Sequence, residues 1–417
     1  MTERLLGTGR SAPVTACQCC GAEGLVSELF LGFLPPVNTM ALIGSRPAEQ
    51  AAYPAEVLRC PACGLVQLGL VVDPRIVFPP DYAYTSGTTK ILRENFAQLA
   101  AEVPSVLTLA PTDLVVDIGS NDGTLLSNFH GKHKALGVEP TGAHRHAVAK
   151  GIPTVNEFFT RELAGRLAKE HGKARLVTAA NVFAHIEDVH GIVDGILELL
   201  APDGVFVNES HYLPSLLETL QYDTVYHEHL RYYSLTSLKA LLERHGLEPI
   251  HAVAIPTHGG SIRTYAARKG AFPVRPSVAA ILAAEAQSLS PEAFAAFRRR
   301  VSLSKMALHA LLWGLKKEGK RVYAIGAPSR AATLVNYVGL DETVVDCVLE
   351  VPGSSKVGKY LPGTRIPVVD EKRLFEDPPD AALLLSWHIA DELIPKLKAK
   401  GYRGAFVVPL PEPRLVG

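Results

Sequence analysis

The chain has 417 residues, more than one ordinary hydrophobic core accommodates, so we expect two or three domains. Apolar residues make up 47% and charged residues 20% of the chain, a balance that excludes a disordered protein. Basic and acidic residues number 42 each, which argues against a protein that follows a nucleic-acid backbone. No run approaches the roughly 18 apolar residues of a membrane span, and the first residues do not resemble a signal peptide, so we expect a cytoplasmic location.

Residues 1–80 contain five of the six cysteines and few helical patterns. The segments CQCCG (17–21) and CPACG (60–64) each contain a C-x-x-C-G turn, which directs two thiolates at one metal ion. Four thiolates favour tetrahedral zinc, bound by Cys17, Cys20, Cys60 and Cys63. Cys19 could replace Cys17, but the Cys17–Cys20 spacing fits better; free cysteines or a redox pair are the alternatives. A four-cysteine site has no open position, so we expect the metal to be structural.

Residues 81–275 predict an α/β domain. A helix is expected at 90–102, and short apolar runs follow, separated by helical patterns, at 114–119, 134–140, 152–158, 174–182 and 204–210. Strands that alternate with helices indicate a parallel sheet covered on both faces. The runs at 249–256 and 261–268 could form an antiparallel pair that closes this sheet.

The segment VDIGSNDGT (116–124) forms a glycine-rich turn after the first run, and we expect it to open a helix. Free amides at such a helix start can approach a ligand closely. Glu139 ends the next run and is placed to hold a ribose diol. Because only Gly119 and Gly123 are present, the G-x-G-x-x-G pattern is absent, which favours S-adenosylmethionine over a dinucleotide. A plain strand–turn–helix is the alternative.

Two histidine-containing segments are candidates for catalysis. NVFAH (181–185) follows the fourth run, where active groups of parallel sheets gather, although a lone histidine such as His185 is usually structural. YHEH (226–229) combines a phenol, a carboxylate and two imidazoles. It lacks the further ligands of an open metal site, so a general base oriented by a carboxylate is the better interpretation. A polar surface turn is the alternative.

Residues 276–417 predict a helical connector over 277–318 and then a second, smaller doubly wound unit. Its runs lie at 320–326, 344–350, 380–388 and 404–410. The turn GAPSR (326–330) could hold a phosphate at a helix start, with Lys356 and Lys359 adding positive charge. Earlier in the chain, HGGS (258–261) and Arg263 either line the site or form a tight bend.

Together these motifs resemble the sugar C-methyltransferases of deoxysugar biosynthesis, whose best-known members act on the C-3 carbon of dTDP-4-keto sugars. The resemblance covers almost the whole chain. Besides the paired C-x-x-C-G turns it includes PPVNTM, YAYTSGTT, VDIGSNDGTLL, GVEPT, NVFAHI, DTVYHEHLRYYS, THGGSIR, IGAPSRAATLVNY and KVGKYLPGTRIPV.

The resemblance implies a zinc domain, a central S-adenosylmethionine domain and a C-terminal Rossmann-like domain, with a nucleotide sugar between the last two. By motif position, His229 would remove the proton next to the ketone, supported by Tyr226 and Glu228, and His185 and Tyr82 or Tyr84 would line the sugar pocket. The methyl donor would be surrounded by Asp117, Gly119, Asn121, Asp122, Glu139 and Asn181. The remaining substrate-binding candidates are His258, Ser261, Arg263, Ser329, Arg330, Lys356 and Lys359.

Three departures from the family pattern lie where the nucleotide should bind: Arg330-Ala331 for Lys-Gly, His388 for Asn after Trp387, and Glu350 for an Asp followed by Asn-Pro. The expected nucleotide is therefore dTDP, with CDP or GDP open, and the expected carbon is C-3, with C-5 open. A monomer or a homodimer is expected. The alternatives are an O- or N-methyltransferase acting on another small molecule, a zinc-bearing RNA methyltransferase, and a non-catalytic binding protein.

Overall fold

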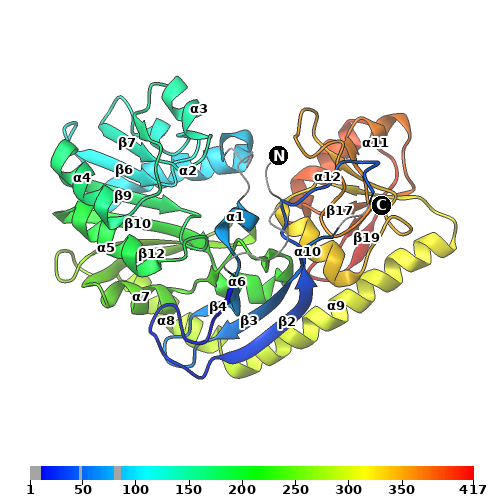
Figure 1. Cartoon of the computed structure of the whole chain (residues 1–417), viewed down its shortest axis with the longest axis horizontal. Helices are drawn as coiled ribbons and strands as arrows, with labels where there is room; N and C mark the ends of the chain where they lie inside the picture. The colour runs from blue at the N-terminus through cyan, green and yellow to red at the C-terminus, as the bar shows by residue number, and fades with distance from the viewer. Residues whose placement is uncertain (1–10, 47–48, 79–85) are drawn as a thin grey trace.

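The computed structural model describes residues 11–46, 49–78 and 86–417. Two α/β lobes lie side by side in Figure 1, with a small sheet below and between them and a long helix running beneath the second lobe. Tyr82 and Tyr84, proposed to reach the sugar, lie outside the described residues.

The small sheet is antiparallel and contains a strand from a distant part of the chain. Its order is β11-β4-β3-β2, formed by β2 (Val26–Leu34), β3 (Tyr53–Arg59), β4 (Val66–Leu68) and β11 (Arg231–Tyr232). The pair β1 (Ala12–Pro13) and β5 (Leu70–Val71) and the short helix α1 (Pro74–Val77) complete this part. Because β11 lies just after the YHEH segment, the N-terminal sheet directly holds the chain that carries the candidate base.

The first lobe contains a seven-stranded sheet in the order β12-β13-β10-β9-β6-β7-β8. Its parallel strands are β6 (Leu114–Ile118), β7 (Lys134–Val138), β8 (Thr154–Val155), β9 (Ala174–Ala180) and β10 (Leu200–His211). The antiparallel strands β12 (Leu247–Ile255) and β13 (Ser261–Arg268) close one edge, which confirms the expected pair. Strand order reverses between β6 and β9, which makes this the switch point where such sheets bind ligands.

Both faces of this sheet are covered, which explains why β6 is buried at every position. One face packs against α2 (Lys90–Glu102). The other packs against α4 (Arg161–His171), α5 (Val189–Leu199) and α7 (Leu235–Glu243), while the short α3 (His144–Ala149) contacts the β7–β8 side.

The helix expected directly after the glycine-rich turn is not formed, and this prediction was wrong. Only a 3-10 turn, Leu126–Asn128, follows β6. The side chains of Ser127 and Asn128 donate to backbone carbonyls of the preceding turn, an arrangement that competes with a continuing helix. Gly131 then follows with φ of 81°.

The connector and second lobe agree with the predicted pattern. Helices α8 (Pro276–Ser288) and α9 (Pro291–Lys317) lead into a sheet of order β16-β15-β14-β17-β18-β19, parallel except for β19. Its strands are β14 (Val322–Ile325), β15 (Cys347–Glu350), β16 (Val368–Asp370), β17 (Ala381–Leu384), β18 (Ala405–Val408) and β19 (Arg414–Val416). The accompanying helices are α10 (Ser329–Val338), α11 (Arg373–Glu376) and α12 (Ala390–Ala399).

One hydrophobic core joins the small sheet to the second lobe. It combines side chains of β2–β4, α6 (Leu213–Glu218), α9 and the second sheet, and Phe294 and Phe297 of α9 belong to it. None of the helices in the described part of the chain combines the length and apolar character that a bilayer crossing requires.

Candidate active site

The predicted cysteines converge on one point. The Sγ atoms of Cys17, Cys20, Cys60 and Cys63 all lie within 4.8 Å of one another. A tetrahedral zinc ion with Zn–S bonds of about 2.3 Å requires sulfurs about 3.8 Å apart, so the four thiols fit the ion. Cys19 lies outside this set, and its Sγ is 3.9 Å from the carbonyl of Ser237.

The methyl-donor turn lies at the switch point, at the carboxyl end of β6. Gly119 has φ of 68°, and a Cβ there would lie 2.5 Å from a methyl group of Val182, so only glycine fits. Glu139, at the end of β7, accepts hydrogen bonds from the backbone N–H groups of Asn121 (2.9 Å) and Thr141 (2.8 Å). Its carboxylate retains acceptor capacity for a ribose hydroxyl, so the residues present fit a nucleoside ligand.

Two further acids support this edge. Asp122 accepts hydrogen bonds from Thr124 Oγ1 (2.6 Å) within the donor turn and from Gly87 N (3.1 Å), which holds the 3-10 turn Ser86–Thr88 before α2 against it. Asp117 lies inside the sheet, and its Oδ1 accepts a hydrogen bond from Thr178 Oγ1 at 2.6 Å. Asn181, after β9, has φ of 60° and donates its backbone N–H to Glu209 O.

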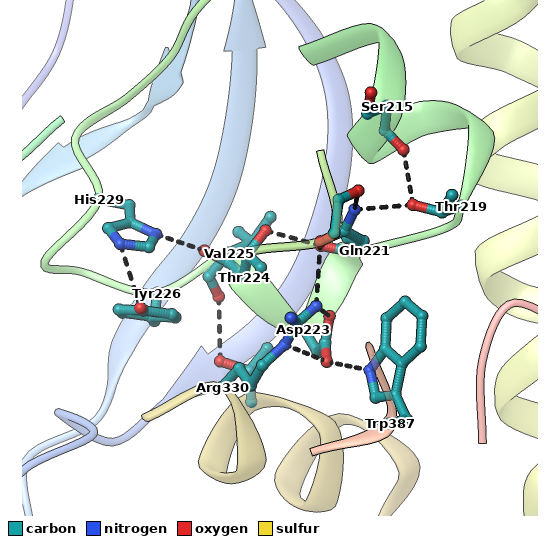
Figure 2. Close-up of polar contacts among 12 residues, drawn as sticks. Ser215, Thr219, Gln221, Asp223, Thr224, Val225, Tyr226, His229, Arg330 and Trp387 are labelled. Atoms are coloured by element: carbon teal, nitrogen blue, oxygen red, sulfur yellow. Dashed lines mark hydrogen bonds and ion pairs between the residues drawn. The ribbon is translucent and has the colours of Figure 1, made fainter. Parts of the chain in front are cut away.

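His229 is buried, and its hydrogen bonds define its tautomer. Its Nδ1 lies 3.0 Å from the carbonyl of Thr224, which can only accept, so Nδ1 carries the hydrogen. Its Nε2 lies 3.1 Å from the hydroxyl of Tyr226 and therefore has a lone pair in the neutral ring (Figure 2). Burial, followed by the nearby His185, holds the pKa of His229 well below its usual range.

His185 lies between His229 and the edge of the sheet that carries the methyl-donor turn. Its ring centroid is 5.0 Å from that of His229, and it follows β9, which pairs with β6. The Nδ1 of His185 donates to the carbonyl of Glu228 at 2.8 Å, so the Nε2 of the neutral ring accepts rather than donates. Burial lowers the pKa of His185, which disfavours the doubly protonated form. In this tautomer the Nε2 of His185 can accept a hydrogen bond from a ligand in the pocket but cannot donate one.

Glu228 interacts with residues from two other parts of the chain. It accepts a hydrogen bond from the side chain of Asn38 and lies close enough to Lys356 to act on its charge. The Nζ of Lys356 donates to Ala327 O at 2.5 Å, at the turn after β14. Burial lowers the pKa of Lys356. Glu228 and Lys356 therefore connect the candidate base segment with the predicted nucleotide site.

His211, at the carboxyl end of β10, is a site residue that the sequence interpretation missed. Its ring centroid lies 5.3 Å from that of His229 and 5.5 Å from that of His258. Burial holds the pKa of His211 well below its usual range and lowers that of His258 to about 4. The signal was present, since His211 directly follows the run predicted at 204–210, and ligands gather at strand ends.

The two glycines after His258 form a tight bend rather than a ligand cradle. A Cβ on Gly259 would lie 2.8 Å from Gln221, and one on Gly260 would lie 2.3 Å from Ser215. His258 itself, with φ of 59°, faces His211. His388, in the 3-10 turn Trp387–Ile389 after β17, is half-buried near Arg330 and His258, and burial lowers its pKa to about 3.

Three residues expected to bind substrate instead form hydrogen bonds or ion pairs with other residues of the protein. The Ser261 Oγ donates to Thr257 O at 2.9 Å inside the fold. Arg263 is fully buried and pairs with Glu209 (3.1 Å) and Glu102 (2.6 Å). These two predictions are corrected, because both side chains are fully buried and bonded to other protein groups.

Arg330 is the third, and it pairs with Asp223 at 2.7 Å, so its guanidinium is already occupied by a protein carboxylate. Its predicted role as a substrate-binding residue is corrected for this reason. Ser329 and Lys359 are half-buried beside the turn and remain predictions.

The donor turn at the switch point and the closed four-thiolate site define a class: S-adenosylmethionine-dependent methyltransferases with a structural zinc domain. Three family models match the chain: a zinc binding domain at residues 17–78, a methyltransferase domain at 91–252 and a C-methyltransferase C-terminal domain at 256–411.

The particular family follows from a full-length relative. The chain is 34% identical over 414 residues to the C-methyltransferase NovU of Streptomyces niveus, covering 97% of each protein. The chain therefore belongs to the S-adenosylmethionine-dependent C-methyltransferases, as the motifs indicated.

Two solved structures of methyltransferases each align with less than half of the chain. The magnesium protoporphyrin IX methyltransferase of Synechocystis PCC 6803 aligns with 43% of this chain and 84% of its own, at 15% identity and a TM-score of 0.34. A Haloferax volcanii complex of the Trm112 activator with a methyltransferase aligns with 44% of this chain and 94% of that one, at 14% identity and a TM-score of 0.35.

Proposed function

We propose that this C-methyltransferase methylates the carbon next to the ketone of a nucleotide-linked 4-keto-deoxysugar, with C-3 as the methylated carbon. The observation that carries the proposal is the buried, neutral imidazole of His229, whose Nε2 lone pair lies 3.1 Å from the hydroxyl of Tyr226. A base and an O–H donor side by side are what the removal of a proton α to a carbonyl requires.

In this proposal, His229 Nε2 takes the α-proton, and the Tyr226 hydroxyl donates to the enolate oxygen. Bound S-adenosylmethionine supplies an electrophilic methyl group. Because Nδ1 of His229 is held by Thr224 O, the ring presents the same nitrogen to the substrate in every encounter. Glu228 acts indirectly, by tying this segment to Asn38 and Lys356. Much of the rate would come from holding the enolate carbon and the methyl group in line.

The substitution His229→Asn tests this role. Asparagine has a similar shape but cannot accept the proton, so methylation should fall by about 10²–10⁴-fold, the usual contribution of a general base. Exchange of the substrate α-hydrogen with solvent deuterium, followed by NMR in the absence of the methyl donor, should fall equally. Exchange at the normal rate in this variant would exclude His229 as the base.

His227→Asn is the matched control for that test. His227 lies two residues away, and its Nε2 donates to Pro54 O at 3.2 Å. Because it does not face the base, exchange should continue in this variant. An O- or N-methyltransferase would show no α-exchange even in the unaltered protein.

The nucleotide can be identified separately. Lys356 and Lys359 provide positive charge beside the turn after β14 and support a diphosphate there. A ligand that binds only the folded state raises its melting temperature. We expect dTDP to raise it more than CDP or GDP at equal concentration, and a larger shift with CDP or GDP would reassign the nucleotide.

A further inference from the structure

A buried ion pair joins the second lobe to the segment that carries His229. The guanidinium of Arg330, in the first turn of α10, contacts both carboxylate oxygens of Asp223, Nε to Oδ2 at 2.8 Å and Nη2 to Oδ1 at 2.7 Å. The indole N–H of Trp387 donates to Oδ2 of the same carboxylate at 2.7 Å (Figure 2). Asp223 is 0% exposed and Arg330 6% exposed, so the pair is shielded from solvent.

The pair is one residue away from the group that orients the base. Asp223 and Thr224 belong to the same 3-10 turn, Tyr222–Thr224, and Thr224 O accepts the Nδ1 hydrogen of His229. On the other side, Thr333 of α10 donates to Val225 O at 3.2 Å. Helix α10 therefore holds the backbone on both sides of Thr224.

A third contact of Arg330 leads to the bend beside His258, one of the histidines near His229. Arg330 Nη2 donates to Gln221 Oε1 at 3.2 Å, and Gln221 Nε2 donates to Gly259 O at 2.7 Å. Gly259 follows His258 directly. The same arginine thus connects the base segment with the bend that places His258.

We propose that Arg330 and Asp223 are positioning residues for His229: the pair fixes the carbonyl of Thr224 and thereby the tautomer and aim of the base. This inference rests on the proposed role of His229. It explains why Arg330 stands at a position expected to bind the nucleotide, since a bidentate guanidinium holds a carboxylate more rigidly than an ammonium group does.

Arg330 also acts on His229 through its charge. The groups that face His229 are Tyr226 and Tyr232 on its own segment, His185 after β9, His211 on β10, His258 after β12 and Arg330 on α10. After burial and His185, the charge of Arg330 is among the causes that lower the pKa of His229. Asp223 carries the opposite charge and is paired with the same guanidinium.

Two substitutions should therefore shift the pH dependence in opposite directions. The base must be neutral, so kcat/KM falls as pH drops through the pKa of His229. We call this fall the acid limb of the pH profile. Arg330→Gln removes a positive charge, raises that pKa and moves the acid limb to higher pH. Asp223→Asn leaves Arg330 unopposed, lowers that pKa and moves the limb to lower pH. Both should lower kcat by about 10–100-fold through misplacement of the base, with KM for the nucleotide sugar nearly unchanged.

Conservative and control variants separate positioning from general loss of structure. Arg330→Lys keeps the positive charge but loses the planar group that donates two hydrogen bonds to Asp223, so we expect a smaller loss of kcat and no shift of the acid limb. Arg59→Gln breaks the pair with Glu28 in the small sheet and should lower the melting temperature without shifting the limb. If a single variant does not fold, the double variant Asp223→Asn/Arg330→Gln, which leaves no unpaired charge, should still show the reduced kcat.

The proposal is overturned if both single variants shift the limb in the same direction or neither shifts it, or if Arg330→Gln raises KM with kcat unchanged, as a substrate ligand would. Its failure is distinguishable from failure of the proposed function. The latter would appear in the unaltered protein, as an absence of α-hydrogen exchange.

Discussion

Asp117, a buried acid in β6 just before the methyl-donor turn, makes the stability of the fold depend on pH. It is 3% exposed within β6, with Thr178 as its hydrogen-bond partner and Glu139 nearby. Burial, followed by the charge of Glu139, raises the pKa of Asp117 to about 7. The folded protein therefore holds a proton on this carboxyl at pH values where an exposed aspartate has lost it.

The free energy of unfolding should fall as pH rises through this window. The unfolded carboxyl has a pKa of about 3.9, whereas the folded one has a pKa of about 7, so between these values the folded state binds more protons. From pH 5 to pH 8, the free energy of unfolding of the unaltered protein should fall by about 2–3 kcal/mol more than that of the Asp117→Asn variant. Urea denaturation at both pH values measures this difference. Buried histidines titrate in both proteins and cancel in this difference. Parallel behaviour of the two proteins would contradict the prediction.

At the residue scale, the sequence located the methyl-donor turn and the metal-binding cysteines correctly. Gly119 lies in the tight turn after β6 that its motif predicted, and the four metal-binding cysteines converge on one point. The role of His229 as the base stays a prediction. Arg330 and Arg263 were misassigned because their partners, Asp223 and Glu209, are distant in sequence. A local pattern shows that a cation is present, but not whether the fold already neutralises it.

At the scale of elements, the strand β11 links the metal site to the candidate base. It pairs with β4, and Leu68 N donates to Leu230 O at 2.9 Å, one residue after His229. Strand β4 begins three residues after Cys63. The zinc turn therefore stabilises the sheet that holds the segment carrying His229, although zinc takes no part in the proposed chemistry.

Cys60→Ser should remove the zinc, lower the melting temperature and abolish methylation together. The loss of activity follows from the displacement of β4 and β11, not from the loss of a catalytic ion. Zinc content by atomic absorption, a thermal melt and a methylation assay check this result. Cys19→Ser is the matched control, since Cys19 lies outside the metal set and this variant should keep its zinc. Full activity in zinc-free Cys60→Ser would contradict the coupling.

Most elements followed from hydrophobic patterning because each strand is a short apolar run bounded by turns. The exceptions are instructive. The missing helix after the donor turn reflects side-chain hydrogen bonds of Ser127 and Asn128, which no apolar period records. Strand β11 has two residues and exists only through its pairing with β4, about 165 residues earlier in the chain, so local propensity could not reveal it.

At the scale of the whole molecule, α9 connects parts that the sequence presents as separate domains. Its buried residues Phe294 and Phe297 face β2–β4 and α6, while Leu312 and Leu315 contribute to the same core beside β14. The order of zinc, donor and C-terminal parts was readable from the motifs. Their shared core was not, because it is built from contacts between distant segments.

Phe297→Ala should lower the free energy of unfolding by about 3–5 kcal/mol, the usual cost of truncating a buried phenylalanine. Because Phe297 touches the small sheet and α6, the loss should appear as one shifted urea transition rather than as early melting of one part. Trp313→Ala on the same helix is the control, since Trp313 is 58% exposed and should change stability by less than about 1 kcal/mol. Two separate transitions in Phe297→Ala would contradict a shared core.

The segment from Gln221 to Tyr232 is anchored at both ends by other parts of the chain: Arg330 and Trp387 hold its start, and β4 holds its end. Chimeras between relatives with different sugar preferences should respect these anchors. A graft that replaces residues 326–417 alone would set a foreign side chain against Asp223. We expect working hybrids to exchange residues 221–225 along with the C-terminal lobe, and to keep 66–68 and 230–232 from the same parent.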